Sequence, residues 1–340
     1  MTEPASWQRP TLGANERTID HAAAFAALPR RSPGAHKWGV GGLVVVAGSP
    51  GYAGAAILTT MAASRAGAGI VMTAISRSLS LALNIHVPEA VIIPLPDGDS
   101  SASGRRAAEL IEAKLEKAAA IVVGPGLGED TAAGLLLAAL FGTRTVRDEI
   151  GFGTSAANVS SNGEDAGLLA ASAKPVVIDA DGLNWLGQQG EWWQRLAPGQ
   201  AVLTPHAGEL ERLSGLPVDV IAADPAAAAR DAASRWRQIV VLKCGHTIVT
   251  DGTVTLVAED VPPSLATAGT GDVLAGTIGA FLAQGVEPMA AAALAVYAGA
   301  RAARRVEERT GTLGLVASDL PLAIAAELAG LERGKENDRD

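Results

Sequence analysis

The sequence contains very little cysteine, few aromatic residues and no concentrated positive charge. Among 340 residues there is one cysteine, and aromatic side chains make up 4%. A single cysteine excludes an internal disulfide framework and a zinc site built from cysteines. The formal charge of −9, without a dense lysine and arginine run, argues against nucleic acid or an anionic membrane surface as a partner. We therefore expect a cytoplasmic protein with neither partner.

Long uninterrupted apolar segments are also missing, although one stretch comes close. Residues 38–64 carry no charge and are long enough for a membrane span, which needs about 20 apolar residues. Glycines and Pro50 interrupt this stretch, so it is better described as a strand, a loop and a helix. Residues 1–33 carry charges in every ten-residue block and do not resemble a secretory signal.

Short apolar runs are abundant, and alanine-rich segments with helical character separate them. Such runs are typical of a mainly parallel sheet covered on both faces, in one large α/β domain. Asp251-Gly252 is a two-residue turn signal between residues 247–250 and 253–257, so we expect a β-hairpin near the end of the sheet. The expected parallel strands are residues 43–47, 70–75, 91–93, 120–123, 176–179, 201–203 and 239–242.

The segments around this domain are expected to be peripheral. Residues 141–172 are rich in Gly, Ser, Asn, Asp and Glu and have no periodicity, which indicates a long, partly helical surface insertion. Residues 333–340 are almost wholly polar and are expected to be a disordered tail. The expected division is an N-terminal extension at 1–34, a domain at 35–332 with the insertion, and the tail.

The most informative loop is residues 266–272, which leads into a helical pattern that closes at Gly285. Glycines allow close backbone approach to a ligand, and the N–H groups at a helix start favour phosphate oxygens. Asp272 stands at this anion site, where a carboxylate is useful for withdrawing a proton from a hydroxyl during phosphoryl transfer. The alternative is that Asp272 merely caps the helix.

Two further glycine loops follow expected strands, at residues 48–55 and 124–128. Loops at the carboxyl ends of strands form the ligand crevice of an open α/β sheet, although each loop by itself is more often a tight turn. The spacing in the first loop does not fit G-x-G-x-x-G, and no acidic residue follows about 20 positions later. A nicotinamide-dependent dehydrogenase is therefore the weaker interpretation.

Polar residues follow three other strands. Asp179, Asp181 and Asn184 are suited to organising Mg²⁺ through water, or Asp181 caps a helix. His206 lies in a loop fixed by proline and glycine, and a binding or proton-relay role competes evenly with a structural one. Lys243 ends a buried strand, where its ammonium needs water or an anion such as a nucleotide phosphate.

Taken in order, these segments resemble the carbohydrate-kinase-like dehydratases that repair hydrated NADH and NADPH, over roughly residues 35–330. The resemblance implies a ribokinase-like three-layer α/β/α sandwich. It also implies removal of water from the hydrated nicotinamide ring, driven by ADP or ATP with Mg²⁺, in which phosphate leaves after phosphorylation of the ring hydroxyl. The matching stretches are residues 36–37, 48–55, 65–69, 88–89, 124–128, 179–184, 204–209, 242–247 and 266–276.

The same resemblance assigns roles to individual positions. Asp272 is implied as the catalytic base. The metal ligands are not indicated, and hydrates of both NADH and NADPH are expected to be accepted. The residues implied to face the hydrated dinucleotide are Ala55, Gly126, His206 and Asp272. The residues implied to face the adenine nucleotide are Lys243, Cys244, Gly245, His246, Thr247, Gly269, Thr270 and Gly271.

Two departures from the family pattern stand out, Ala268 for a glycine and Ala207 for a proline, and neither removes a chemical group.

The resemblance further implies a homo-oligomer, such as a tetramer, and a separate NAD(P)H-hydrate epimerase as a pathway partner. The competing interpretations are a kinase of the same fold, acting on a vitamin precursor or sugar, and a nucleotide-binding regulatory protein without turnover.

Overall fold

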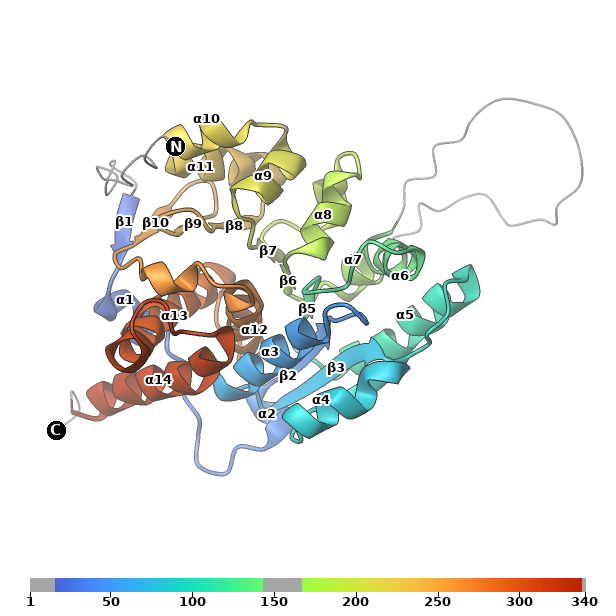
Figure 1. The fold of residues 1–340 in the computed structure, drawn as a ribbon, viewed down its shortest axis with the longest axis horizontal. Helices are drawn as coiled ribbons and strands as arrows, with labels where there is room; N and C mark the ends of the chain where they lie inside the picture. Colours follow the sequence, from blue (N-terminus) through green and yellow to red (C-terminus); the bar gives the residue numbers. More distant parts are fainter. Residues whose placement is uncertain (1–15, 143–166, 338–340) are drawn as a thin grey trace, which may run out of the picture.

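Ten strands form the single sheet at the centre of the molecule (Figure 1). The computed structural model describes residues 16–142 and 167–337. The strand order is β1-β10-β9-β8-β7-β6-β5-β2-β3-β4. The strands are β1 (Glu16–Ile19), β2 (Gly42–Val46), β3 (Ile70–Ser76), β4 (Val91–Leu95), β5 (Ala120–Val123), β6 (Val176–Ile178), β7 (Ala201–Leu203), β8 (Ile239–Leu242), β9 (Ile248–Thr250) and β10 (Thr255–Ala258).

The sheet is parallel apart from β9, which runs antiparallel to both of its neighbours. This arrangement confirms the seven expected parallel strands and the expected hairpin. The hairpin does not end the sheet, however, because β1 adds to β10 in parallel. Part of the expected N-terminal extension is therefore built into the fold, and Ile19 of β1 is 2% exposed. The sequence did not predict β1, because a strand with a single buried side chain gives too weak a pattern.

Helices cover both faces of the sheet, which gives the expected three layers. Side chains of β2 alternate between the two layers, with Leu43 and Val45 in one hydrophobic cluster and Val44 and Val46 in the other. One layer contains α1 (His21–Ala27), α3 (Ala53–Arg65), α4 (Ser80–His86), α12 (Thr270–Ala283), α13 (Pro288–Thr310) and α14 (Leu320–Asn337). The other contains α5 (Ser101–Leu115), α6 (Thr131–Phe141), α7 (Leu168–Ser172), α8 (Asp181–Gly187), α9 (Ala207–Ser214), α10 (Val218–Ala223) and α11 (Pro225–Trp236).

The peripheral segments are only partly visible. Of the expected insertion, the end of α6 and all of α7 are helical, while residues 143–166 lie outside the described residues. Helix α14 continues to Asn337, beyond residue 333, where we expected a disordered tail to begin. No helix among residues 16–142 and 167–337 combines the length and apolar character needed to cross a bilayer.

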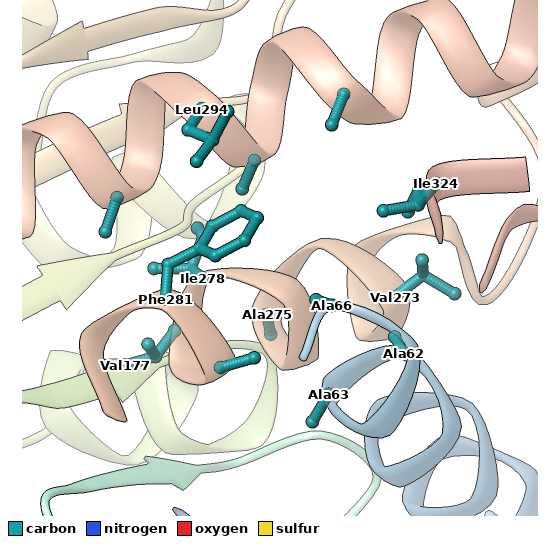
Figure 2. Close-up of a cluster of buried hydrophobic side chains, with 14 of the residues drawn as sticks. Ala62, Ala63, Ala66, Val177, Val273, Ala275, Ile278, Phe281, Leu294 and Ile324 are labelled. Carbon is teal, nitrogen blue, oxygen red and sulfur yellow. The ribbon is translucent and has the colours of Figure 1, made fainter. Parts of the chain in front are cut away.

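Small residues allow α3 and α12 to pack closely. Figure 2 shows Ala62 and Ala63 of α3, and Ala66 just after it, beside the turn of α12 that carries Ala275. At the contact itself, a Cβ added to Gly276 would lie 2.2 Å from the carbonyl oxygen of Thr59. This spacing places the start of α12 against the sheet, and any side chain at position 276 would push the helices apart.

The substitution Gly276→Ala should therefore destabilise the protein. We expect the free energy of unfolding to fall by about 1–3 kcal/mol, because the added methyl group overpacks a backbone contact. Urea unfolding followed by circular dichroism measures the change. Gly134→Ala in α6 is the matched control, since no atom lies within 4 Å of its added Cβ. A loss for Gly276→Ala no greater than that of the control would contradict this account of the packing.

Candidate active site

The site forms where the carboxyl ends of the parallel strands meet the start of α12. Gly269 precedes this helix with φ of 90°, a left-handed conformation that favours glycine. A Cβ added there would lie 2.7 Å from Leu58 of α3, so the loop backbone runs close to its neighbour. No side chain caps α12, and Asp272 in its first turn is not a cap. The capping alternative is wrong, and the first N–H groups have no side-chain partner.

The Asp272 carboxyl group lies in an unusual electrostatic environment. Burial raises its pKa, and the neighbouring carboxylates Asp179 and Asp181 raise it further, whereas Lys243 lowers it. The net result is a pKa of about 7. A carboxyl group with this pKa is partly ionised at neutral pH and is suited to accepting and returning a proton.

Lys243 ends β8 as expected, but carboxylates of the protein itself surround its ammonium. Its Nζ donates to Asp179 Oδ1 at 2.9 Å and lies 4.0 Å from Glu209 Oε2. Asp179 is 1% exposed, and the same oxygen accepts a hydrogen bond from Thr204 Oγ1 at 2.7 Å. Burial alone would lower the pKa of Lys243, but the attraction of Asp179 and Glu209 outweighs it and raises the pKa. The lysine is therefore charged before any phosphate arrives.

His206 begins α9 and has a structural role that the sequence left open. Its Nδ1 accepts from the backbone N–H groups of Gly208 and Glu209, and Glu209 Oε2 accepts from the backbone N–H of His206. This is a capping box with histidine as the capping residue. Because Nδ1 is an acceptor, the neutral ring carries its proton on Nε2, and the side chain is 54% exposed. The ring is thus a helix cap, and its Nε2 lies 3.5 Å from Glu209 Oε1.

Ala55 and Gly126, two of the residues implied to face the hydrated dinucleotide, lie next to each other. Gly126 has φ of +61°, and a Cβ added there would lie 2.6 Å from the Cβ of Ala55 and 2.8 Å from that of Tyr52. The loop is also tied to the start of α8, because the N–H of Gly128 donates to Asp181 Oδ2 at 2.8 Å. Asp181 therefore links this loop to the first turn of α8 and does not cap the helix, whose N-cap Ala180 has no side-chain hydrogen bond.

Asp179, Asp181 and Asn184 do not form a resident metal site, and the expected organisation of a nucleotide-bound Mg²⁺ through water stays a prediction. Asp179 Oδ1 accepts from Lys243 and Thr204, and Asp181 Oδ2 accepts from Gly128. Asn184 donates to Asp181, and its own Oδ1 accepts from Arg212 at 3.1 Å. Within the described ranges, no three His, Cys, Asp or Glu side chains gather where they could hold a metal ion.

A cavity of about 330 Å³ opens beside Lys243 and the start of α12. Six of the eight residues implied to face a nucleotide line it: Lys243, Cys244, Gly245, Thr247, Thr270 and Gly271. Its remaining wall is mostly apolar, and sequence analysis missed it because it comes from the loop after β10, from α13 and from α14. The apolar wall includes Val261, Pro262, Pro263, Leu274, Val296, Leu320 and Ile324.

Several side chains at this cavity are engaged within the protein. Thr270 Oγ1 donates to the carbonyl groups of Leu265 and Thr267 at 2.9 and 3.0 Å, and His246 Nδ1 lies 2.8 Å from the carbonyl oxygen of Ala258. His246 and Gly269 do not line the cavity. Burial raises the pKa of the Cys244 thiol to about 11, so the thiol is not a nucleophile. The cavity therefore offers mainly backbone groups, the ammonium of Lys243, the carboxylate of Asp260 and an apolar wall.

The charge of Lys243 should control the ionisation of Asp272. In Lys243→Met we expect the pKa of Asp272 to rise above about 7, because the ammonium is the neighbour that favours the ionised carboxylate while Asp179 opposes it. Carboxyl ¹³C NMR across a pH series measures this pKa. Lys114→Met on the exposed side of α5 should leave it unchanged. An unchanged or lower pKa in Lys243→Met would refute the coupling.

Comparisons with known proteins agree with this geometry. The family model described as NAD(P)H-hydrate dehydratase matches residues 43–145 and 165–325. A bifunctional NAD(P)H-hydrate repair enzyme of Salinibacter ruber is 38% identical over 308 residues, which cover 89% of this chain and 51% of the relative. This chain thus spans about half the length of such relatives. An ADP-dependent (S)-NAD(P)H-hydrate dehydratase of Xanthomonas campestris is 31% identical over 95% of this chain and 99% of its own length.

Solved structures share the fold. A ribokinase-like protein of Enterococcus faecalis superposes with a TM-score of 0.75 at 22% identity, covering 95% of this chain and 99% of its own. The ADP/ATP-dependent NAD(P)H-hydrate dehydratase of Bacillus subtilis superposes with a TM-score of 0.71 at 23% identity, covering 94% and 99%. The ribokinase-like prediction is confirmed, and the chain belongs to the NAD(P)H-hydrate dehydratase family.

Proposed function

We propose that this protein removes water from the hydrated nicotinamide ring of NADH hydrate and NADPH hydrate, with ADP or ATP as the phosphoryl donor. One observation carries the proposal: Asp272, whose pKa is about 7, lies near Lys243, whose side chain lines the nucleotide-sized cavity. The similarity to the Xanthomonas dehydratase over nearly both full lengths supports the same activity.

The reaction balances without any further reactant. Asp272 takes the proton of the ring hydroxyl, whose oxygen attacks the terminal phosphorus of the nucleotide. The bond from that phosphorus to the bridging oxygen breaks, so ADP leaves as AMP. Phosphate then departs from the ring with its bonding electrons, and a proton leaves the neighbouring ring carbon. With ADP as the donor, the products are the dihydronicotinamide, AMP and phosphate. Phosphorylation makes the elimination easier because phosphate is a better leaving group than hydroxide.

The start of α12 supports the transferring phosphoryl group. Its first N–H groups have no side-chain cap, and the positive end of the helix dipole favours the developing negative charge. Mg²⁺ travels with the nucleotide in this proposal, where it offsets phosphate charge. No step assigned to this chain depends on a resident metal.

The apolar cavity wall is suited to the adenine base. Part of this wall is the loop after β10, which Arg304 of α13 holds in place. The guanidinium of Arg304 donates to both carboxylate oxygens of Asp260 at 2.7–3.0 Å. Arg304 also binds Glu307 at 2.8 Å, and Glu307 accepts from the N–H of Ser264. The loop is thus fixed to α13 at two points, and Asp260 lines the cavity.

The implied partners complete the proposal. Ala55, Gly126 and His206 line the dinucleotide side, while Lys243, Gly245, Thr247 and Gly271 line the nucleotide side. We further propose a cytoplasmic homo-oligomer that acts beside a separate epimerase. The similarity to dehydratases supports this function rather than that of a small-molecule kinase of the same fold. The product distinguishes the two functions, since a kinase releases a stable phosphorylated substrate.

The substitution Asp272→Asn should abolish turnover by removing the base. The assay incubates hydrated NADH with ADP or ATP and follows the return of the dihydronicotinamide absorbance. We expect a loss of at least about 100-fold in kcat, the usual contribution of a general base. Asp219→Asn on the surface of α10 should keep wild-type activity. Full activity in Asp272→Asn, or consumption of ATP with an untouched hydrate, would defeat the proposal.

The wild-type pH profile tests the same residue. Because the base must be ionised and its pKa is about 7, kcat/KM should fall about tenfold per pH unit below neutrality and level off above it. The expected inflection lies about three pH units above that of an ordinary aspartate. A profile that stays flat down to pH 5 would exclude Asp272 as the base.

The loop contact at Arg304 predicts a selective effect on the nucleotide. Arg304→Gln should raise the KM for ADP about five- to tenfold with little change in kcat, since it frees the loop but leaves Asp272 in place. Arg305→Gln is a matched control on the same helix, because Arg305 pairs with Glu327 at 2.6 Å, away from the loop. Equal effects of the two substitutions would show that the loop contact is unimportant.

A further inference from the structure

A second cavity, of about 190 Å³, lies at the other end of the same sheet edge. It opens beyond the carboxyl ends of β2, β3 and β4, beside the loops that begin at Gly48 and Gly124. Leu127 and Ser49 line it, so it adjoins the loops that carry Ala55 and Gly126. Its polar lining centres on Asp97, just after β4.

The carboxylate of Asp97 is held in one orientation. The hydroxyl groups of Ser76 and Ser78 and the backbone N–H of Ser78 all donate to its Oδ1. Among the described residues these bonds use one oxygen, so Oδ2 is the oxygen left to accept from a ligand. The Ser76 hydroxyl contributes most to lowering the pKa of Asp97, which keeps the group ionised at neutral pH. Asp97 is exposed to solvent, and it offers a fixed, ionised acceptor in the lining of the cavity, which is suited to a diol.

The strand order sets the separation between this cavity and Asp272. Asp179 and Asp181, the carboxylates next to Asp272, follow β6, and β3 and β4 lie three and four strands away. With strands about 4.8 Å apart, this separation is roughly 14–19 Å. The start of α3, which has no side-chain cap, lies between the two positions and offers N–H groups to an anion. An elongated ligand fits this arrangement if its central pyrophosphate lies at the start of α3 and its two ends lie at Asp272 and at the second cavity.

We propose that the second cavity holds the ribose of the adenosine half of the hydrated dinucleotide, and that Asp97 accepts hydrogen bonds from its 2′- and 3′-hydroxyl groups. This inference rests on the proposed function and adds a specificity to it: the enzyme prefers NADH hydrate to NADPH hydrate. A 2′-phosphate would face the carboxylates of Asp97 and Asp130, and none of the residues lining the cavity is a lysine or arginine.

Arg77 is the residue that would give the opposite preference, for NADPH hydrate. It lies between Ser76 and Ser78 and is close enough to Asp97 to help lower the pKa of that carboxyl group. Its side chain is exposed and does not line the cavity. A guanidinium that swung over the cavity would bind a 2′-phosphate and would reverse the preference, so Arg77 has to be part of the test.

The experiment compares kcat/KM for the two hydrates at saturating ADP. We expect the wild-type protein to favour NADH hydrate by about tenfold or more, and Asp97→Asn to reduce that ratio at least about fivefold, mainly through KM. Asp99→Asn is the matched control, because Asp99 is exposed two residues away and does not line the cavity. Its ratio should equal the wild-type value.

Three results would overturn the inference. They are equal use of both hydrates by the wild-type protein, an unchanged ratio in Asp97→Asn, and a preference for NADPH hydrate that Arg77→Gln abolishes. A parallel measurement of NADH and NADPH binding by fluorescence, without nucleotide, separates this inference from the proposed function. If neither hydrate is turned over, the proposed function fails, whereas tighter NADH binding that Asp97→Asn weakens would still support the cavity assignment.

Discussion

The ion pair between Lys243 and Asp179 is the interaction on which the site depends. Asp179 is almost fully buried, and removing one partner of a buried pair costs about 3–5 kcal/mol because the other charge is left without compensation. The pair joins the end of β8 to the end of β6. Its ammonium also lies near Glu209 and acts on Asp272, so one positive charge allows three carboxyl groups to lie close together. Without it, their mutual repulsion would favour protonation.

The same charge balance explains why the pKa of Asp272 is far above that of an ordinary aspartate but still allows partial ionisation at neutral pH. Burial and the Asp179 carboxylate favour its protonated form, while Lys243 favours the ionised form. The position of the carboxyl group depends in turn on α12, which approaches α3 closely because Gly276 has no side chain. Backbone packing therefore positions this carboxyl group, and the buried ion pair tunes its pKa.

The strand order places two cavities at different regions of one sheet edge. The large, mostly apolar cavity lies beside β8 and the hairpin, and the smaller polar cavity lies beyond β2, β3 and β4. Asp272 and the loops around Gly126 and Ala55 lie between them. In the proposed function, a nucleotide and a dinucleotide therefore approach Asp272 from opposite sides without sharing a binding surface.

The sequence by itself determined the strands from β2 to β8, the hairpin and the glycine loops, because apolar runs and turn residues are local signals. It also placed Asp272, Lys243 and His206 at the ends of elements. The sequence could not show that Asp179 would bind Lys243 or that Asp181 would hold Gly128. The capping of α9 by His206 is a local contact that the sequence analysis left open.

Only the tertiary structure decided those partners, the apolar wall around Val296 and the polar cavity around Asp97. It also built β1 into the edge of the sheet. The physical reason is distance along the chain: these groups are separated by tens to hundreds of residues, and the order of parallel strands determines which of them meet.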